Sequence, residues 1–239
     1  MSRLLEGRRA VVTGASRGIG LATARLLASE GARVAMLARG AEALRAQAAS
    51  IGANALPLPC DVGDADAVEA AIVELRARFA GAPDIVVNNA GLFPLARVED
   101  LSRDTFVSTL EVNLIAPFLL VRALLPEMRA RGSGDIVTVG SVADRATFPE
   151  NGAYAASKFG VRALHQVLRA ELRGSGVRAI LVSPGPVDTA LWDEVDLDAR
   201  PGFTPRSSML SPDAVADAIR YAVTRPREVD IEELRLGRS

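Results

Sequence analysis

The side chains best suited to chemistry are Tyr154 and Lys158, which are four residues apart in Asn151-Gly-Ala-Tyr-Ala-Ala-Ser-Lys158. The segment has a helical pattern, so both side chains project from one helix face. An ammonium beside a phenol stabilises the phenolate and lowers the tyrosine pKa from about 10 toward the working range. Such a phenol can exchange a proton with a carbonyl or alcohol oxygen. Ser141 ends the preceding strand pattern, where a hydroxyl can reach the crevice of an open α/β sheet.

A glycine-rich turn is the second candidate site. The run Thr13-Gly14-Ala15-Ser16-Arg17-Gly18-Ile19-Gly20 follows the first apolar stretch directly, and a helical pattern begins within it. Glycine permits a tight turn, and a helix N-terminus offers unpaired N–H donors to a pyrophosphate. The spacing departs from G-x-G-x-x-G, so the general dinucleotide fingerprint is not met as written. By itself the run fits either a dinucleotide site or an ordinary strand-to-helix turn.

The same turn also satisfies G-x-S-x-G around Ser16, which is the nucleophile-elbow pattern of serine hydrolases. A hydrolase would need His165 as its base, because the chain has no other histidine. His165 falls within a predicted helix, where the loop-borne histidine of that fold is not expected. A hydrolase at Ser16 is therefore kept as a remote alternative, and His165 is expected to be a packed or exposed helix residue.

Short apolar runs alternate with longer segments of helical period and so predict the elements that position these residues. Strands are expected at 10–13, 33–37, 55–60, 84–88, 135–139 and 178–183, and helices at 19–30, 41–50, 65–79, 103–131 and 151–173. Apolar runs without alternation suit parallel strands covered by helices on both faces. We expect a single-domain, doubly wound α/β Rossmann fold over residues 1–239, with a parallel seven-stranded sheet.

An irregular, proline-containing stretch at about 186–211 interrupts this pattern. Loops of that length are usually lids or binding loops, so we expect a lid over the substrate. The segment Ser211-Pro212-Asp213 then predicts the start of another helix, because serine caps a helix and proline suits its first turn.

Composition excludes several classes of function. The net charge is −1 and the arginines occur in twos, so neither nucleic acid nor an anionic membrane is an expected partner. The N-terminus does not resemble a secretory signal, and no stretch approaches the length of a bilayer span. The single cysteine, Cys60, cannot form an internal disulfide and lies in what looks like a buried strand end. We expect a cytoplasmic protein without a metal site, since one histidine also removes most zinc sites.

Taken together, the motifs make the chain similar to the short-chain dehydrogenase/reductase family over nearly its whole length. The family pattern T-G-x-x-x-G-x-G corresponds to Thr13–Gly20, N-N-A-G to Asn88–Gly91, and the P-G motif after the sixth strand to Pro184-Gly185. The active-site asparagine, serine, tyrosine and lysine correspond to Asn113, Ser141, Tyr154 and Lys158. The ending Val229–Leu236 resembles the last strand of members that reduce small hydroxy acids, amino-alcohols and aldehydes.

The resemblance implies that hydride passes between nicotinamide C4 and a substrate carbon, while Tyr154 exchanges a proton with the oxygen. Ser141 would hydrogen-bond that oxygen, Lys158 would lower the Tyr154 pKa and hold the nicotinamide ribose, and Asn113 would fix a water. Thr189 would contact the carboxamide. The other residues expected at the cofactor are Gly14, Ser16, Arg17, Gly18, Ile19, Gly20, Ala38, Arg39, Asp61, Val62, Asn89, Ala90, Gly91, Pro184, Gly185 and Val187, with Asp61 and Val62 at the adenine.

The end of the second strand predicts which nicotinamide cofactor is used. Members that prefer NAD carry an acidic residue there, which binds the ribose 2′-hydroxyl. Here the positions are Ala38 and Arg39, so no carboxylate repels a 2′-phosphate, and Arg39 with Arg17 can bind it. The prediction is NADP(H), unless both arginines are merely solvated.

The substrate pocket is expected to be largely apolar and to be formed by Leu92–Leu95, Val142–Pro149, Pro184–Val187 and the lid residues Leu191 and Trp192. The residues expected to contact the substrate are Ser141, Val142, Phe148, Tyr154, Leu191 and Trp192. A hydrophobic aldehyde, ketone or secondary alcohol fits such a pocket, with reduction the favoured direction. The helical segments 102–131 and 151–173 resemble those that form the family's oligomer contacts, so we expect a homotetramer or a homodimer. A dinucleotide-binding redox sensor without catalysis stays open as an alternative to an NADP(H)-dependent carbonyl reductase.

Overall fold

The computed structural model contains one seven-stranded sheet in the order β3-β2-β1-β4-β5-β6-β7, and every neighbouring pair is parallel. The structure describes residues 3–193, 195, 197 and 203–239. The strands are β1 (Arg9–Thr13), β2 (Arg33–Ala38), β3 (Ala55–Pro59), β4 (Ile85–Asn88), β5 (Gly134–Val139), β6 (Val177–Pro184) and β7 (Glu233–Leu236). The doubly wound Rossmann fold is therefore confirmed, and the first six strands lie within a residue of their predicted ends.

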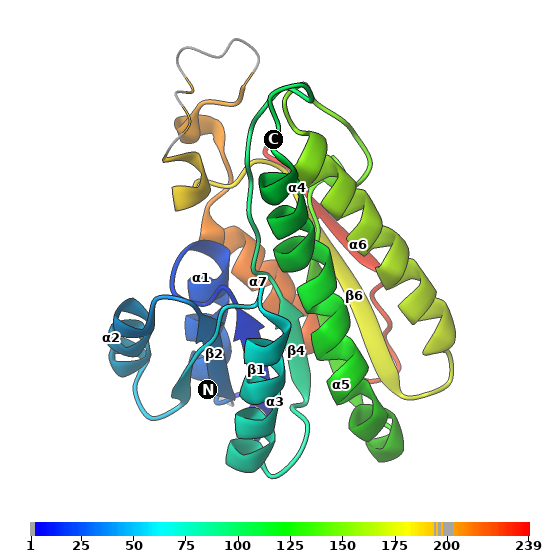
Figure 1. Cartoon of the computed structure of the whole chain (residues 1–239). Helices are drawn as coiled ribbons and strands as arrows, with labels where there is room; N and C mark the ends of the chain where they lie inside the picture. Colours follow the sequence, from blue (N-terminus) through cyan, green and yellow to red (C-terminus); the bar gives the residue numbers. More distant parts are fainter. Residues whose placement is uncertain (1–2, 194, 196, 198–202) are drawn as a thin grey trace.

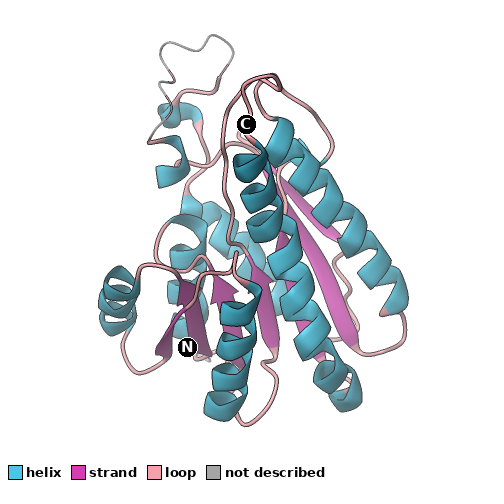
Figure 2. Ribbon diagram, viewed as in Figure 1, coloured by secondary structure: helices cyan, strands magenta, loops and turns pink. Residues whose placement is uncertain are grey.

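Helices cover both faces of this sheet, as Figures 1 and 2 show. They are α1 (Gly18–Ser29), α2 (Ala41–Ile51), α3 (Ala65–Phe79), α4 (Arg103–Leu110), α5 (Ala116–Arg131), α6 (Gly152–Glu171) and α7 (Pro212–Val223). Two apolar cores result: one packs α1, α2 and α7 against the sheet, and the other packs α3, α5 and α6. Burial on both sides explains why the runs in β1 and β2 are apolar without alternation.

Local signals set where several helices begin. The Asp64 carboxylate accepts hydrogen bonds from the backbone N–H groups of Asp66 and Ala67 at the start of α3. Ser211 accepts from the Ala214 N–H and is followed by Pro212, which confirms the predicted cap of α7. These contacts satisfy donors that the first turn of a helix leaves unpaired.

The helical stretch Arg103–Arg131 differs from expectation in two ways. It contains a π-helical turn, η1 (Glu111–Ile115), between α4 and α5. It is also long and apolar enough to pass a test for membrane-spanning helices by length and composition, contrary to the expectation that no stretch approaches that length. The core helix of a soluble protein passes the same test, and here α5 packs on α3 and β5 while α4 packs on α6.

The predicted lid at 186–211 is described in part. It contains the short helical turns η3 (Ala190–Trp192) and η4 (Arg206–Ser208), so the described part is not structureless. A bridge pairs Val187 with Leu210 and brings the ends of the segment together. Residues 194, 196 and 198–202 of the predicted lid lie outside the described residues.

Candidate active site

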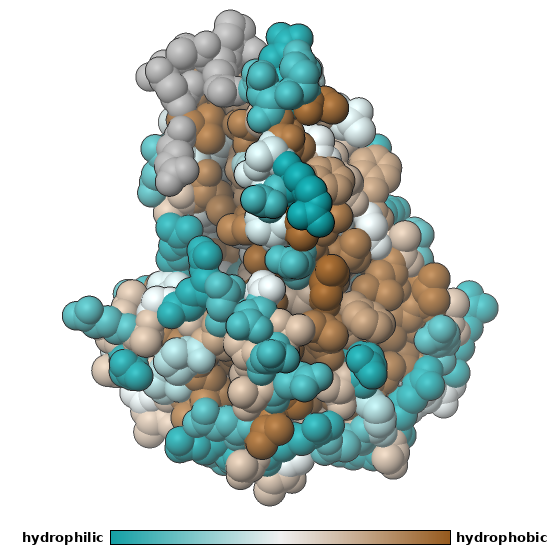
Figure 3. All heavy atoms as spheres, viewed as in Figure 1, coloured by the Kyte–Doolittle hydropathy of each residue, from teal (hydrophilic) through white to brown (hydrophobic). Residues whose placement is uncertain are grey.

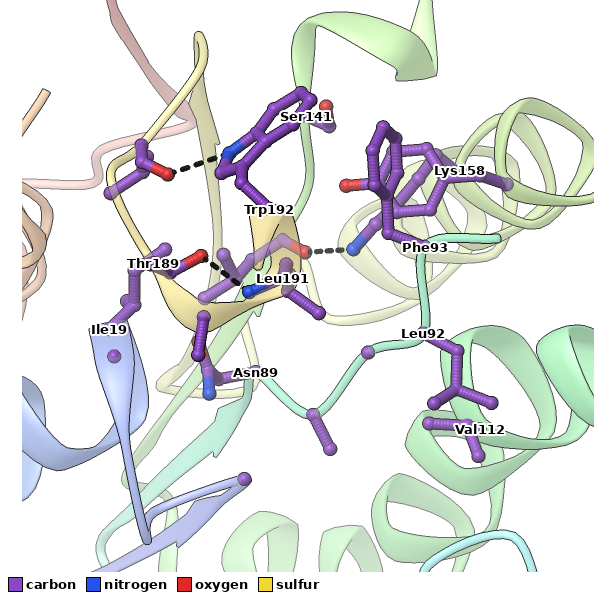
Figure 4. A pocket seen from close by; sticks show the side chains of 18 of the residues that line it. Ile19, Asn89, Leu92, Phe93, Val112, Ser141, Lys158, Thr189, Leu191 and Trp192 are labelled. Atoms are coloured by element: carbon purple, nitrogen blue, oxygen red, sulfur yellow. Dashed lines mark hydrogen bonds between the residues drawn. The ribbon is translucent and has the colours of Figure 1, made fainter. Parts of the chain in front are cut away.

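A single cavity of about 1330 Å³ brings the two predicted motifs together. It lies at the carboxyl ends of the strands around β1 and β4, where the strand order reverses. Almost every residue predicted for the cofactor, the substrate or catalysis lines this cavity, including Tyr154, Lys158 and the glycine turn. The exceptions are Gly20 and Asn113, which do not line the cavity. Figure 4 shows Asn89 and Thr189 on one side of it and Lys158 and Phe93 on the other.

The glycine turn leaves room for a ligand at the start of α1. Gly14 and Gly18 adopt φ angles of 66° and 55°, which residues other than glycine rarely adopt. A Cβ on Gly20 would lie 2.3 Å from the Gly14 carbonyl oxygen, so Gly20 serves the turn by close packing rather than by lining the cavity. The N-cap residue of α1, Arg17, makes no side-chain capping bond, so the first N–H groups of the helix are free to bind an anion.

The segment after β4 is fixed to this turn. Asn89 donates from its side-chain amide to the Thr13 carbonyl at 2.8 Å, and its backbone N–H donates to the Thr13 hydroxyl at 2.9 Å. A Cβ on Gly14 would approach the Ala90 Cα to 2.9 Å. The two motifs that the resemblance assigned to the cofactor therefore contact each other directly.

Arg17 and Arg39 both line the cavity and are both exposed. Arg39 follows Ala38, the last residue of β2. Within the described part of the chain, neither guanidinium forms a hydrogen bond or an ion pair that would hold it away from a ligand. The acidic residue Asp61 also lines the cavity, and its carboxylate accepts a hydrogen bond from the Gly63 N–H.

Tyr154 and Lys158 lie one turn apart on α6 and both face the cavity. The Lys158 ammonium donates to the Val139 carbonyl oxygen at 2.9 Å and lies 5.5 Å from the centroid of the tyrosine ring. Burial raises the pKa of Tyr154 above its usual value, and the Ser141 hydroxyl opposes that shift. Burial lowers the pKa of Lys158 to about 8, and the Asp144 carboxylate opposes that shift.

The Tyr154 pKa is therefore raised overall, in contrast to the lowering that the spacing of Tyr154 and Lys158 predicts. The physical reason is that burial disfavours the charged form of each group, and the ammonium is directed to a backbone carbonyl rather than to the phenol oxygen. At neutral pH the phenol is protonated and is ready to act as a proton donor.

Lys158 is also distinguished by composition, in a way that motif analysis missed. It is the only lysine in the chain, and every other one of its 28 basic residues is arginine. Arginine stays charged in proteins, whereas the pKa of a lysine shifts readily on burial. The chain thus uses lysine only where a compact, titratable cation faces the cavity.

Asn113 lies on the π-helical turn η1, and its side chain is buried. Its amide oxygen accepts from the Leu92 N–H at 2.8 Å, and its amide nitrogen donates to the Leu92 carbonyl and to the Ser157 hydroxyl. Asn113 therefore fastens the loop after β4 to α6. The π turn, which often marks functional sites in helices, gives it this position.

Aromatic side chains close the substrate end of the cavity. Phe93 packs edge-on against Tyr154 and Trp192, with ring centroids 4.8 Å and 4.9 Å apart. Trp192 donates its indole N–H to the Val187 carbonyl at 3.0 Å, and the Phe203 ring packs edge-on against the Trp192 ring, with centroids 6.1 Å apart. Phe93 falls within the predicted pocket range Leu92–Leu95, whereas Phe203 was not predicted, because one aromatic residue in a loop carries no periodic signal.

The hydrolase alternative loses its base in this arrangement. Ser16 lines the cavity, whereas His165 is buried on α6 and does not line it. The His165 Nδ1 pairs with the Thr138 hydroxyl at 3.1 Å, and burial lowers the pKa of the imidazole to about 4. The sequence predicted that His165 would be either a packed or an exposed helix residue, and it is packed.

Comparison with known proteins agrees with this geometry. The model of the family described as short chain dehydrogenase matches residues 8–200. The D-threitol dehydrogenase of Mycolicibacterium smegmatis is 42% identical over 221 residues, which cover 90% of this chain and 85% of that protein.

Solved structures superpose on the chain closely. A metagenomic short-chain oxidoreductase in complex with NADP has a TM-score of 0.85 at 34% identity, and the match covers 99% of each chain. The alcohol dehydrogenase from the archaeon Thermococcus sibiricus, complexed with 5-hydroxy-NADP, has a TM-score of 0.85 at 34% identity and covers 96% of this chain and 95% of its own.

Proposed function

The chain belongs to the short-chain dehydrogenase/reductase family, and we propose that it is an NADP(H)-dependent oxidoreductase that interconverts a carbonyl compound and an alcohol. The observation that carries this proposal is the shared cavity, in which the glycine turn and the pair Tyr154 and Lys158 face one space. A cavity of about 1330 Å³ exceeds the usual volume of a small-molecule site, about 300–1,000 Å³, and so has room for a dinucleotide together with a substrate.

The residues present fit a dinucleotide. The uncapped N-terminus of α1 would offer N–H donors to the pyrophosphate, and Asp61 and Val62, which line the same cavity, would contact the adenine. Thr189 and Lys158, which also line the cavity, would contact the nicotinamide half. Bound there, the nicotinamide supplies or accepts the hydride.

Tyr154 acts as the general acid and base of the proposed reaction. Its raised pKa keeps the phenol protonated at neutral pH, so it can donate a proton to a carbonyl oxygen as that carbon is reduced. Ser141 faces the same cavity and provides a hydroxyl for that oxygen. Because the reverse reaction needs the phenolate, this protonation state favours reduction over oxidation at neutral pH.

The free guanidinium groups of Arg17 and Arg39 support NADP(H) over NAD(H). Neither has a partner among the described residues, and both line the cavity: Arg39 follows the end of β2, and Arg17 is the N-cap residue of α1. The neighbouring family members crystallised with NADP or 5-hydroxy-NADP are consistent with this choice. An arginine pair binds a 2′-phosphate through charge-assisted hydrogen bonds.

The cofactor preference is tested by kcat/KM with NADPH and with NADH. We expect the wild type to prefer NADPH and Arg39→Asp to reverse or abolish that preference. Arg45→Asp is the matched control, because Arg45 is exposed on α2 and does not line the cavity. Equal use of both cofactors by the wild type would sink the proposal of NADP(H) preference.

An apolar carbonyl compound fits the substrate end best. The walls around Tyr154 come from Phe93, Val142, Phe148 and Trp192. A polyol of the kind named for the D-threitol dehydrogenase would leave several hydroxyl groups facing apolar surface, which costs free energy unless they find hydrogen bonds. We therefore propose hydrophobic aldehydes and ketones as substrates, with secondary alcohols as products.

Turnover is tested by following NADPH at 340 nm with a panel of carbonyl compounds and an ester panel alongside. Tyr154→Phe keeps the ring and removes the hydroxyl, so we expect about 10²- to 10⁴-fold less turnover with NADPH binding retained. Full turnover in Tyr154→Phe would overturn the mechanism. NADPH binding without turnover of any compound by the wild type would favour the redox sensor, and ester cleavage lost in Ser16→Ala would favour the hydrolase.

An oligomer is the third part of the proposal. Figure 3 shows apolar side chains gathered over α5 and the neighbouring α6. Phe118 on α5, Phe159 on α6 and Ile115 at the end of the adjoining η1 are each exposed by more than two fifths. A patch of this kind marks an interface, so we propose a homodimer or homotetramer through these helices, in the cytoplasm. Sedimentation of the wild type and of Phe118→Glu tests it: a lower mass for the variant is expected, and a monomeric wild type contradicts it.

A further inference from the structure

Asp144 lies directly behind the catalytic turn and is the most enclosed carboxylate near the cavity. Its side chain is fully buried at the end of the short helical turn η2 (Val142–Asp144), which Ser141 begins. One carboxylate oxygen accepts hydrogen bonds from the Ser141 N–H at 3.3 Å and from the Ser183 hydroxyl at 2.6 Å. The other accepts from Arg145 Nε at 2.7 Å and from Arg162 Nη1 at 3.2 Å. All four partners are donors.

The Asp144 carboxylate and its two arginine partners connect four elements: η2, α6, β6 and β7. Ser183 lies on β6 and Arg162 on α6, while Arg145 follows η2. Glu233 on β7 completes the arrangement by pairing with Arg145 and, at 3.6 Å, with Arg162. Two arginines thus balance two carboxylates, and the group as a whole carries no net charge. The chain also leaves space for it, because a Cβ on Gly140 would approach the Asp144 oxygen to 2.5 Å.

We propose that Asp144 is a positioning residue for the proposed carbonyl reduction, holding Ser141 against the sheet so that its hydroxyl faces Tyr154 and the substrate oxygen. This inference rests on the proposed function. Among the described residues Ser141 itself makes no hydrogen bond to β6 or β7: its hydroxyl accepts from the Ala143 N–H within the same turn. The preceding residue is held to β6, because the Gly140 N–H donates to the Val182 carbonyl at 2.8 Å. Asp144 is the side chain that adds a second attachment, from the turn to β6 and α6.

The charge of Asp144 also acts on the two residues of the proton transfer. Burial is the main influence on the pKa of Lys158, which it lowers, and the Asp144 carboxylate opposes it by favouring the ammonium. Burial also raises the pKa of Tyr154, and Asp144 adds to that effect. Both effects favour the protonated site that reduction requires.

Asp144→Asn tests the hold on Ser141 with little change in volume. An amide has one acceptor oxygen and one NH₂ donor, whereas the site presents donors on both sides. The amide oxygen will face the two arginines, because bonds to charged donors are the stronger ones. The NH₂ then opposes the Ser141 N–H, whereas the Ser183 hydroxyl can rotate and accept from it, so the contact that is lost is the one that holds Ser141.

The experiment is a double-mutant cycle with Ser141→Ala, read as kcat and KM for the best carbonyl substrate of the wild type. Alone, Asp144→Asn is expected to lower kcat about tenfold or more, as small misplacements of catalytic groups do, with NADPH affinity by calorimetry unchanged. In the Ser141→Ala background the same change is expected to cost little more, because residues that act as a unit are not additive. Asp230→Asn is the control: it removes an exposed carboxylate from Arg169, away from the cavity, and is expected to leave kcat unchanged.

A second variant, Glu233→Gln, keeps Asp144 and weakens only the ion pairs of Glu233 with Arg145 and Arg162, which are partners of Asp144. The double-mutant cycle can therefore be run even if Asp144→Asn does not fold. Glu233→Gln is expected to give a smaller loss of kcat that again disappears in Ser141→Ala. Two results would overturn the inference. In the first, the losses of kcat multiply fully in the double variants; in the second, the single variants are as active as Asp230→Asn. Neither result would contradict the proposed carbonyl reduction. A wild type that reduces no carbonyl compound overturns the proposed function and this inference with it.

Discussion

Replacing Lys158 by methionine should stabilise the cofactor-free protein at pH 7 while removing its activity. The pKa of Lys158 is about 8 in the folded chain, against 10.5 for an ordinary lysine, because burial disfavours the ammonium. At 1.36 kcal/mol per unit, the folded state at pH 7 carries a cost of about 3 kcal/mol. Losing the hydrogen bond to Val139 costs about 1 kcal/mol, so the net gain in the free energy of unfolding is about 2 kcal/mol.

The pH dependence of this gain has a definite sign. Below about pH 8 both the folded and the unfolded chain hold the proton, so the full cost is present. Between about pH 8 and 10.5 only the unfolded chain holds it, so wild-type stability rises with pH. Above that range both forms are neutral, and the advantage of Lys158→Met disappears.

Urea unfolding of both proteins at pH 7 and at pH 11, without cofactor, measures the difference. Because Lys158 is the only lysine, carbon NMR of a chain labelled at lysine gives its pKa from a single side-chain signal. A methionine variant that is less stable than the wild type at pH 7 would refute the reasoning. So would an advantage that persists unchanged at pH 11, since it could not come from the charge.

Other outcomes follow from the same contacts. Reduction should lose kcat/KM above about pH 8 as Lys158 gives up its proton, and a pH–rate profile flat to pH 10 would contradict this. Asp135→Asn should lower the free energy of unfolding by about 3–5 kcal/mol in urea, because its buried carboxylate pairs with Arg8, Arg178 and Arg227; a loss under 1 kcal/mol would count against it. Phe93→Ala should raise kcat/KM for bulky ketones relative to small aldehydes, since Phe93 closes the cavity against Tyr154. An unchanged ratio across a size series would show that Phe93 does not limit the substrate.

Much of the fold was predictable because each element carries its own signal. The apolar runs and helical periods placed the first six strands within a residue, since a strand buried on both faces needs no alternation. Ser211 and Pro212 predicted the start of α7, because serine is a common N-cap residue and proline suits the first turn. The π turn around Asn113 has no such local signal; in the folded chain it lies against α4, α5 and α6.

Part of the candidate site was likewise predictable from local sequence patterns, and part was not. The glycine turn and the spacing of Tyr154 and Lys158 are local patterns, and they led to residues that do line one cavity. Asp144 was overlooked, although Ser141 and Asp144 form a capping box whose S-x-x-D spacing is visible in the sequence. Its partners Ser183 and Glu233 lie far along the chain, so only the folded sheet brings them to it.

The sequence by itself determined the family, the parallel sheet and which residue types face the cofactor and substrate, because these depend on local spacing and on periodic burial. The tertiary structure decided the electrostatics of Tyr154 and Lys158. Spacing alone predicts an ammonium that lowers the pKa of its phenol, whereas burial of both groups and the Val139 carbonyl produce a protonated tyrosine and a lysine with a pKa of about 8. Desolvation depends on everything packed around a group, and no local pattern contains that information.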